Sequence, residues 1–245
     1  MAARRARKQA QPASFLADST AAGPQGGPSN NHEAQRRDTT LKPVAIQFRD
    51  KRDIRPLPPI PDELVADMKE LIATKINSHD LNLFEKLEAV YAFTDRLNAF
   101  VATFAVCQKG CNHCCRIDVQ VSRLEAEYIT VKGGPQLDQG EARTMGHKTA
   151  CPFVGSDGSC TVYKTRPFNC RTFHTLDDPK YCVDGDEDHQ VYGASGLGYG
   201  VSIYQMLASW LKDVHDTNAL PYRDIRDWFQ PKPSLMNRLM GRLKG

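Results

Sequence analysis

No stretch of the sequence approaches the roughly 20 consecutive apolar residues that a membrane-spanning helix needs. A secretory signal is also missing. The charged start between Arg4 and Lys8 is followed only by Phe15-Leu16, and not by an apolar run of about 7–15 residues. A basic start that is poor in acidic residues is shared by mitochondrial transit peptides, which stay the alternative. We therefore expect a cytoplasmic protein without a transmembrane segment.

An excess of charge of one sign is also missing. Lys and Arg together number 32 and Asp and Glu number 29, which gives a net charge of +3. Residues 1–50 hold eight of the basic and four of the acidic residues, so the rest of the chain sums to −1. Nucleic-acid-binding domains present a strongly basic face, which a near-neutral domain lacks. We therefore expect no nucleic-acid partner.

Cysteine is absent except in one segment, and all eight cysteines lie between Cys107 and Cys182. In a reducing compartment, clustered thiols indicate metal binding or redox chemistry and not structural disulfides. The adjacent pair Cys114-Cys115 favours the same interpretation, because a disulfide between neighbours strains the chain that joins them. The sequence therefore predicts a metal site, with a disulfide framework as the alternative.

The cysteines form two runs with 35 residues between Cys115 and Cys151. Two short-spaced groups on either side of a long excursion are the usual way to build a four-ligand site. Thiolate is a soft ligand that selects zinc, copper(I) or iron–sulfur clusters. The predicted metal ligands are Cys107, Cys111, Cys114 and Cys115 in the first run and Cys151, Cys160 and Cys170 in the second.

Eight thiols are more than one four-coordinate site needs. Either the chain has two metal sites, or it has one site and spare cysteines. Neighbouring side chains tend to diverge, so one of Cys114 and Cys115 is a candidate spare, and we expect Cys182 to matter less than the other seven. His113 and His174 are not required as ligands, and we expect them at the surface or behind the ligands.

Two arginines, Arg166 and Arg171, flank Cys170. A four-thiolate site carries net negative charge, which a nearby guanidinium offsets while it donates to sulfur or to backbone carbonyls. The alternative is that both arginines pair with surface carboxylates such as Asp177. The site interpretation favours an anionic cluster over a neutral site of two thiolates and two imidazoles.

Two aromatic residues of the second run, Tyr163 and Phe153, are expected to pack over the metal and limit its contact with solvent. Arg166, Arg171 and Tyr163 are therefore predicted to contact the bound centre. The predicted centre is an iron–sulfur cluster of the 4Fe–4S type or zinc, which cysteine spacing does not separate.

Apolar residues at helical spacing predict helices from Asp62, over about 81–105 and over about 200–216. The second of these helices is expected to run into Cys107. Ser122-Arg-Leu-Glu125 is a capping box, which predicts a short helix through about Val131. Residues 151–190 are loop-rich, and a bound metal would supply the stabilisation that they lack. The predicted fold is mainly α: a small helical domain with a loop-rich, metal-binding cysteine lobe and a disordered N-terminal tail.

Three parts are predicted along the chain. Residues 1–55 form a disordered basic tail, because Gly and Pro interrupt a stretch without apolar periodicity. Residues 56–230 form the helical domain, which contains the cysteine cluster at 105–182. Residues 231–245 form a short basic amphipathic segment.

The cysteine pattern resembles the YkgJ-type cysteine-cluster family, described as zinc- or iron-chelating. The resemblance covers about residues 105–182 and includes the first run ending in Cys114-Cys115. The first spacing is Cys-x3-Cys, where many members have Cys-x2-Cys, so Cys107 departs from the family's spacing. In the second run the matching motifs are Cys151-Pro-Phe, Cys160-x-x-Tyr163 and Arg166-Pro-x-x-Cys170-Arg171.

This resemblance implies a mainly helical bacterial cytoplasmic protein that binds an iron–sulfur cluster or zinc. The family has no single agreed activity, although flagellin lysine methylases show a similar cysteine pattern. The leading hypothesis is a metal-binding protein of undetermined biochemical role. The alternatives are a cluster-dependent enzyme, either a group transferase or a redox catalyst, and an interaction module in which zinc shapes a surface for a protein partner.

Overall fold

The computed structural model describes residues 52, 56–108, 110–184, 188–194 and 198–229. The tail predicted at 1–55, apart from Arg52, and the segment predicted at 231–245 lie outside the described residues. Helices predominate in the described part, and two small sheets accompany them. None of the described helices is both long and apolar enough to cross a membrane.

Helix α1 (Asp62–Leu71) begins directly after Pro61, as its sequence predicts. Asp62 and Glu63 in the first turn and Lys69 in the last complement the helix dipole. The helix continues as a π-helical turn at Ile72–Ile76. Its buried side chains, which share one face, are Leu64, Met68 and Leu71.

Helix α2 (Leu83–Val101) begins at a capping box, in which Asn82 and Glu85 satisfy each other's backbone N–H groups. The helix ends at Val101, so the expectation that it runs into Cys107 is wrong. The chain turns at 101–105, where the N–H groups of Phe104 and Ala105 both donate to the Val101 carbonyl. After this turn the chain is held by a distant segment, because the Val106 N–H donates to the carbonyl of Thr175 at 3.1 Å.

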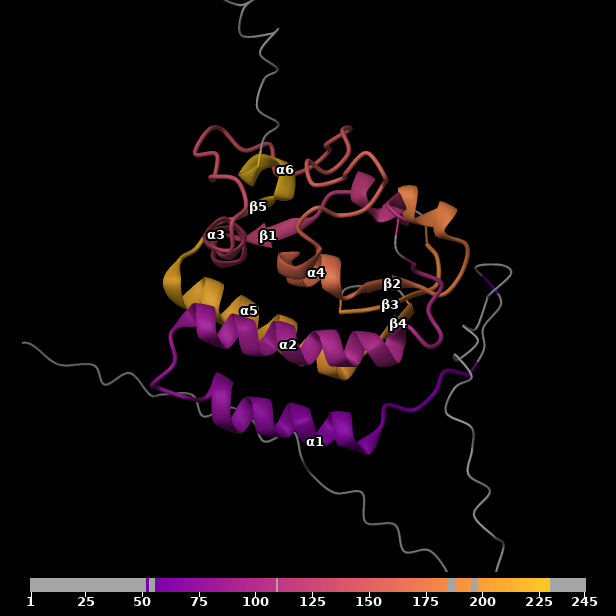
Figure 1. The fold of residues 1–245 in the computed structure, drawn as a ribbon, viewed down its shortest axis with the longest axis vertical. Coiled ribbons are helices and arrows are strands. Elements are labelled where there is room, and N and C mark those ends of the chain that lie inside the picture. Colours follow the sequence, from indigo (N-terminus) through magenta and orange to yellow (C-terminus); the bar gives the residue numbers. More distant parts are fainter. Residues whose placement is uncertain (1–51, 53–55, 109, 185–187, 195–197, 230–245) are drawn as a thin grey trace, which may run out of the picture. The chain divides into compact units, whose positions relative to one another are not determined.

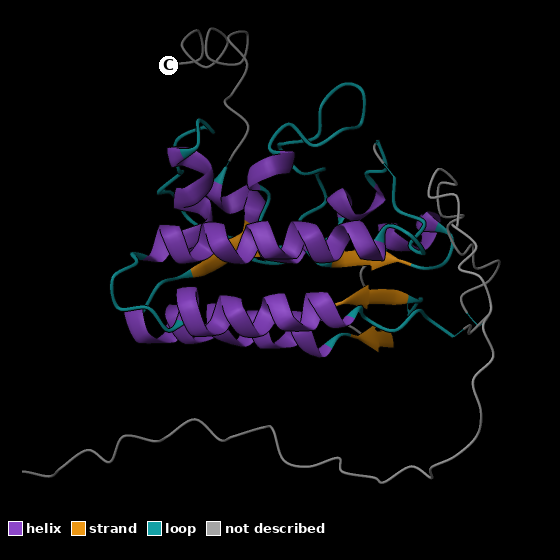
Figure 2. Cartoon of the chain, turned by 60° about the horizontal axis from the view of Figure 1, so that its bottom comes forward, coloured by secondary structure: helices purple, strands orange, loops and turns teal. Residues whose placement is uncertain are grey.

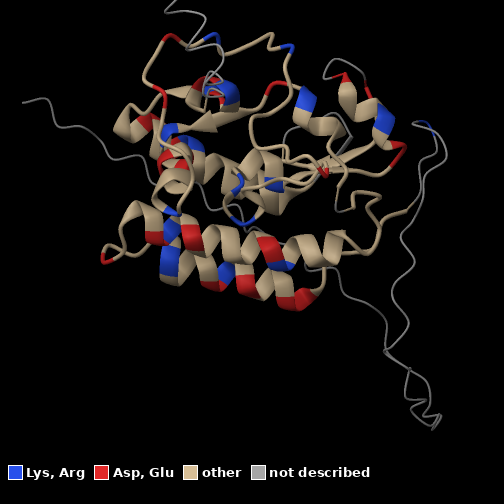
Figure 3. Cartoon of the chain, turned by 45° about the horizontal axis from the view of Figure 1, so that its top comes forward, with Lys and Arg blue, Asp and Glu red and all other residues tan. Residues whose placement is uncertain are grey.

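Helix α5 (Ser202–Asn218) lies alongside α2, and α1 lies next to them (Figures 1 and 2). Helix α5 ends at Asn218, and the next residue, Ala219, has a left-handed backbone with φ 50°. Helices α1, α2 and α5 share one hydrophobic core with part of helix α3 (Arg123–Val131). Positive and negative side chains are interspersed along α1 and α2 (Figure 3). Fully buried residues of this core include Leu87, Val90, Leu97, Tyr204 and Leu207.

Two small sheets join distant parts of the chain. Strand β1 (Gln120–Ser122) pairs antiparallel with β5 (Tyr222–Asp224). Strand β2 (Phe173–Thr175) pairs antiparallel with β3 (Val191–Gly193), which pairs parallel with β4 (Gly198–Gly200). The prediction of a mainly helical fold is therefore correct only in part, because two small sheets join the cysteine lobe to the rest of the chain.

A second, smaller core lies beneath the cysteine lobe. It is built from β1, α3, Phe153 and the segment that contains helix α6 (Ile225–Trp228). The Trp228 indole N–H donates to the Val121 carbonyl at 2.9 Å, which fixes α6 against β1. Cys151 and Cys160 pack against this core. The two cysteines therefore rest on a hydrophobic base that the C-terminal part of the described chain helps to form.

Candidate metal centre

The first cysteine run is a tight turn followed by a 3-10 helix. Gly110 has φ 89°, a conformation that side-chain-bearing residues rarely adopt, and the Cys111 N–H donates to the Gln108 carbonyl. The helix at His113–Arg116 then carries Cys114 and Cys115. Gly110, directly before Cys111, therefore makes the tight turn of the first run.

The second cysteine run folds back against the first. The turn at 155–158 is closed by hydrogen bonds between Gly155 and both Gly158 and Ser159. Gly158 has φ 78°, and a Cβ atom added there would lie 3.0 Å from the Gly110 carbonyl oxygen. This close approach requires glycine and brings the two runs together. Cys170 follows on helix α4 (Phe168–Arg171).

A backbone hydrogen bond and a buried arginine join the two runs directly. The Cys151 N–H donates to the Cys115 carbonyl at 2.8 Å. Arg226 is 4% exposed, and its guanidinium donates to the carbonyls of Thr149, at 2.8 Å, and Ile117, at 2.9 Å. The same guanidinium makes a longer contact of 3.4 Å to the Cys115 carbonyl. Arg226 therefore fixes the backbone on both sides of the cysteine lobe.

Sequence reasoning missed Arg226, although one signal pointed to it. It is a charged residue directly after Ile225 and just before Trp228 and Phe229, all of which are buried. Its own charge is balanced by Asp224, whose carboxylate oxygens lie 2.9 and 3.0 Å from Nη1. A buried charge needs such a partner.

Four thiols form one mutually interacting set, which we call the Cys115 group. Cys170 interacts electrostatically with the other three thiols. Cys151 interacts with Cys115 and Cys160, and Cys160 interacts with Cys115. Every pair in the set is therefore close enough to interact. The Cys115 group consists of Cys115, Cys151, Cys160 and Cys170.

Three other thiols, Cys107, Cys111 and Cys182, form a second set that we call the Cys107 group. Cys107 interacts with Cys111, and Cys182 interacts with both. Cys182 belongs to the 3-10 helix at Pro179–Val183, which packs against the 3-10 helix that carries Cys114. Cys114 interacts with Cys107 and with Cys170, so it lies between the two groups. The structure thus brings Cys182, which the sequence sets aside, together with two predicted ligands.

Burial shifts most of these thiols toward the neutral form. It raises the pKa of Cys151 to about 12 and raises the pKa values of Cys160 and Cys170. Backbone N–H groups oppose the effect of burial at two of them, since the N–H of Phe153 donates to Cys151 and that of Val162 to Cys160. A metal would replace the lost protons as the positive partner of these sulfurs.

Cys115 differs from its neighbours because its pKa is lowered to about 7. The main cause is the hydrogen bond from the Cys114 thiol, and the positive charges of Arg226 and Arg166 add to it against the opposing effect of burial. The same hydrogen bond, with burial, raises the pKa of Cys114. Cys115 is therefore the thiol of the pair that is prepared to act as a thiolate.

Arg166, predicted from the sequence as a site residue, brings a positive charge to the Cys115 group. This charge acts on Cys115, Cys160 and Cys170. Its Nε atom is buried and has no hydrogen-bond partner in the described part of the chain. Tyr163 stacks on the guanidinium at 4.0 Å and is 58% exposed. Tyr163 therefore covers Arg166, and its contact with a bound centre stays a prediction.

Arg171, also predicted as a site residue, is 1% exposed and is fully engaged by protein groups. It pairs with Asp95, and not with Asp177, and lies over the Tyr91 ring at 4.1 Å. Its remaining donors reach the carbonyls of Arg166, at 2.8 Å, and Lys164. Arg171 therefore shapes the segment that carries Cys170 by holding its backbone to α2.

Histidine contributes little to the candidate site. His174 is buried against Asn98 and Tyr204, and Asn98 Oδ1 lies 3.1 Å from its Nε2 atom. Burial, together with the charge of Arg166, lowers the pKa of His174 to about 4. His113 begins the 3-10 helix within the first cysteine run and is half-buried. The side chain of His174 thus supports the fold beside the thiols.

The donor chemistry of the lobe fits a soft metal or an iron–sulfur cluster. In the arrangement of the described residues, no group of three or more His, Cys, Asp or Glu side chains could hold a metal ion. Ligation therefore requires the thiols to move closer together. Two features already favour a negatively charged centre there: backbone N–H groups directed at sulfur, and the Nε atom of Arg166, which has no partner among the described residues.

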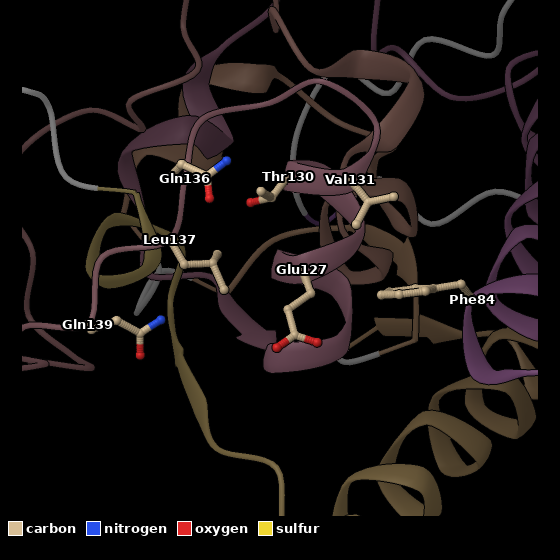
Figure 4. Close-up of a pocket in the computed structure, with 7 residues that line it drawn as sticks. All are labelled: Phe84, Glu127, Thr130, Val131, Gln136, Leu137 and Gln139. Atoms are coloured by element: carbon tan, nitrogen blue, oxygen red, sulfur yellow. The ribbon is translucent and has the colours of Figure 1, made fainter.

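A pocket of about 520 Å³ lies elsewhere, between α2, α3 and the segment that follows α3. Phe84 and Leu137 lie on either side of the Glu127 carboxylate (Figure 4). No cysteine lines this pocket, so it is not part of the thiol groups.

One comparison with known proteins gave a match. Residues 106–190 match the CxxCxxCC family model, described as a "putative zinc- or iron-chelating domain". The match confirms the resemblance to the cysteine-cluster family and spans all eight cysteines. Neither the curated proteins nor the solved structures yielded a match to the chain.

Proposed function

We propose, starting from a zinc- or iron-chelating domain at residues 106–190, that the Cys115 group holds an iron–sulfur cluster of the 4Fe–4S type. Zinc is the second candidate. The observation that carries this proposal is that the two cysteine runs are joined, since the Cys151 N–H donates to the Cys115 carbonyl at 2.8 Å and Cys151 and Cys160 pack against the same hydrophobic core. The electrostatic interactions among the four thiols agree with this arrangement. Four thiolates are the usual ligand set of both centres. A bound cluster would supply one-electron chemistry, whereas zinc would cross-link the lobe.

The charges around the Cys115 group support an anionic centre. Arg166 and Arg226 both act on Cys115, and the buried Nε atom of Arg166 is a donor without a partner in the described ranges of the chain. Hydrogen bonds and positive charge near the sulfurs are the features that tune iron–sulfur clusters. A mixed site with imidazole has less support, because His174 is already engaged by Asn98. These features rank the cluster ahead of zinc.

The other parts of the proposal follow from the sequence. We propose that residues 56–230 form one domain around the cysteine lobe, and that it works in the cytoplasm, where thiols stay reduced. Residues 1–55 and 231–245 would then be appendages to this domain.

The experiment is anaerobic purification of the full chain, with iron, zinc, acid-labile sulfide and the visible spectrum measured on one sample. A brown protein with iron and sulfide supports the cluster. A colourless protein with stoichiometric zinc and no sulfide selects zinc. A protein that retains neither metal after purification and anaerobic reconstitution contradicts the proposal.

The Cys160→Ser variant tests the ligand set. It should lose the metal of the Cys115 group, because serine is a poor ligand for soft metals. Thr161→Ser is the matched control, because the change is next door and the Thr161 hydroxyl, which donates to the Phe153 carbonyl, is kept. Full metal content in Cys160→Ser would show that the group as defined is not the site.

A further inference from the structure

The Cys107 group is organised by Thr175, a residue outside both cysteine runs. The Thr175 N–H donates to the Cys107 sulfur at 3.3 Å, and the side chains of Thr175 and Cys182 share a hydrogen bond. The Thr175 carbonyl also accepts from the Val106 N–H. Both Cys107 and Cys182 are therefore hydrogen-bonded to the same residue of strand β2, Thr175. The turn at Gly110 returns the chain so that Cys111 joins them.

The electrostatic surroundings of the two thiol groups differ. Arg166 and Arg226 act on the Cys115 group. The Cys107 group faces the buried carboxylate of Asp177, whose negative charge acts on Cys182. The positive charge of Arg166 acts on Cys107. Asp177 is fully buried and is held by Thr175, at 2.6 Å, and by His189, at 3.0 Å.

These surroundings favour different ligands. An anionic cluster with its own sulfide and four thiolates is stabilised by arginines, whereas a single divalent cation with three thiolates carries less negative charge and needs fewer of them. Access differs as well. Cys107 is solvent-exposed, Cys182 is buried, and Cys111 and every member of the Cys115 group are partly buried. A cation at the Cys107 group would therefore be open to exchange with solution on the side of Cys107.

We propose that Cys107, Cys111 and Cys182 form a second metal site, separate from the Cys115 group, which takes a soft cation such as zinc or copper(I). Three thiolates leave one position of a four-coordinate ion to a ligand from outside the group. Cys114 is left out because it donates its hydrogen bond to Cys115. This proposal extends the proposed function and rests on it only in treating clustered thiols as ligands.

The test is a titration of the metal-free full chain with Cd²⁺ under anaerobic conditions. Thiolate-to-cadmium absorption reports sulfur ligation, and competition with a chelator counts the tightly bound ions. Wild type should bind two equivalents, one of which the chelator removes faster. Cys107→Ser and Cys182→Ser should each bind one equivalent and lose the fast component, while Cys160→Ser should bind one and lose the slow component.

Each other outcome overturns one specific statement. Two equivalents in both Cys107→Ser and Cys182→Ser would overturn the second site and leave the Cys115 group intact. Two equivalents in Cys160→Ser would contradict the proposed function but not the second site. Loss of all cadmium from every variant would show a single shared site. Because Cys182 is buried, circular dichroism must show that its variant is folded, and the exposed Cys107 supplies the independent substitution.

Discussion

Arg166 is the residue whose charge links the two thiol groups. It acts on Cys115, Cys160 and Cys170 and also on Cys107. Its Nε atom has no partner among the described residues, so the thiols are its natural acceptors. The cost of burying such a donor is recovered once an anionic centre forms beside it.

Replacement of Arg166 by Gln should weaken metal retention by roughly 10–100-fold, the usual effect of losing a partner of the ligands. Competition of the loaded protein with a chelator measures this change. Lys164→Gln is the matched control, since it removes the same charge from an exposed side chain two residues away. Equal metal retention in the two variants would show that Arg166 does not act on the centre.

His174 makes the stability of the protein depend on pH. Its pKa is lowered to about 4 by burial and then by Arg166, while the unfolded value is near 6.5. The unfolded state therefore binds the proton more tightly, and stability is lost as pH falls from about 6.5 towards 4. The loss attributable to His174 should approach about 3 kcal/mol below pH 4.

Denaturant unfolding of wild type and His174→Gln at several pH values measures this effect. The variant keeps a polar side chain beside Asn98 but has no group that titrates in this range. Its free energy of unfolding should fall less steeply between pH 6.5 and 4. Parallel curves for the two proteins would show that His174 is not buried in its neutral form.

Capping boxes start two of the helices, and they differ in what else they hold. Glu85 at the start of α2 bonds the Asn82 N–H in an exposed position. Glu125 at the start of α3 is 4% exposed and also accepts from the Tyr91 hydroxyl and the Phe168 N–H. The second capping box thus joins three helices, because Phe168 opens α4 and Tyr91 lies on α2.

Glu125→Ala should therefore cost about 3 kcal/mol or more in unfolding free energy, because it leaves several buried donors without acceptors. Glu85→Ala, which removes the equivalent residue of an exposed box, should cost about 1 kcal/mol or less. Chemical denaturation measures both. A similar cost for the two substitutions would refute the joining role of Glu125.

Arg226 connects α6 to the cysteine lobe, and its removal leaves the buried Asp224 without its charge partner. Arg226→Met should lower the unfolding free energy by about 3–5 kcal/mol. Arg223→Met on the neighbouring strand is the matched control and should cost about 1 kcal/mol, because Arg223 donates to a single carbonyl among the described residues, that of Gly140, and stacks on Trp228. The prediction fails if both arginine variants unfold at the same denaturant concentration.

Sequence reasoning predicted the helices well because their signals are local. The start of α1 after Pro61 and the capping box of α3 can be read within four residues. The strands were harder to predict because each is three residues long and is defined by a distant partner, as when Gln120 pairs with Asp224. The predicted end of α2 was wrong for the same reason. A hydrogen bond from the Val106 N–H to the distant Thr175 carbonyl determines the path of the chain after Val101.

At the scale of the whole molecule, the described chain has two hydrophobic cores of unequal size. The larger core belongs to α1, α2 and α5, and the smaller one supports Cys151 and Cys160. A small core contributes little stability of its own, so a bound metal stabilises the lobe more than the helices.

Metal removal should therefore open the cysteine lobe before the helical core. Hydrogen exchange of the loaded and metal-free protein, followed by mass spectrometry, measures this difference. Peptides from 107–171 should lose protection, while peptides from α2 and α5 should keep most of it. Uniform loss of protection along the chain would mean that the two cores unfold as one unit.

The cysteine spacing predicted that the thiols would cluster, but it did not predict how they divide into two groups. Cys114 and Cys115 are neighbours in sequence, yet only Cys115 interacts with all the thiols of the second run. Cys182 joins Cys107 through Thr175, a contact between segments that no local pattern encodes. Such assignments depend on tertiary packing and not on spacing.

The contact between Arg226 and the Cys115 carbonyl also sets an order of events during synthesis. The two residues are 111 positions apart, and a ribosome adds roughly 5–20 residues per second. Cys115 is thus made roughly 6–22 s before the arginine that fixes its backbone. During that interval the nascent chain displays reactive sulfur without its final support, so the finished centre is a product of the completed polypeptide.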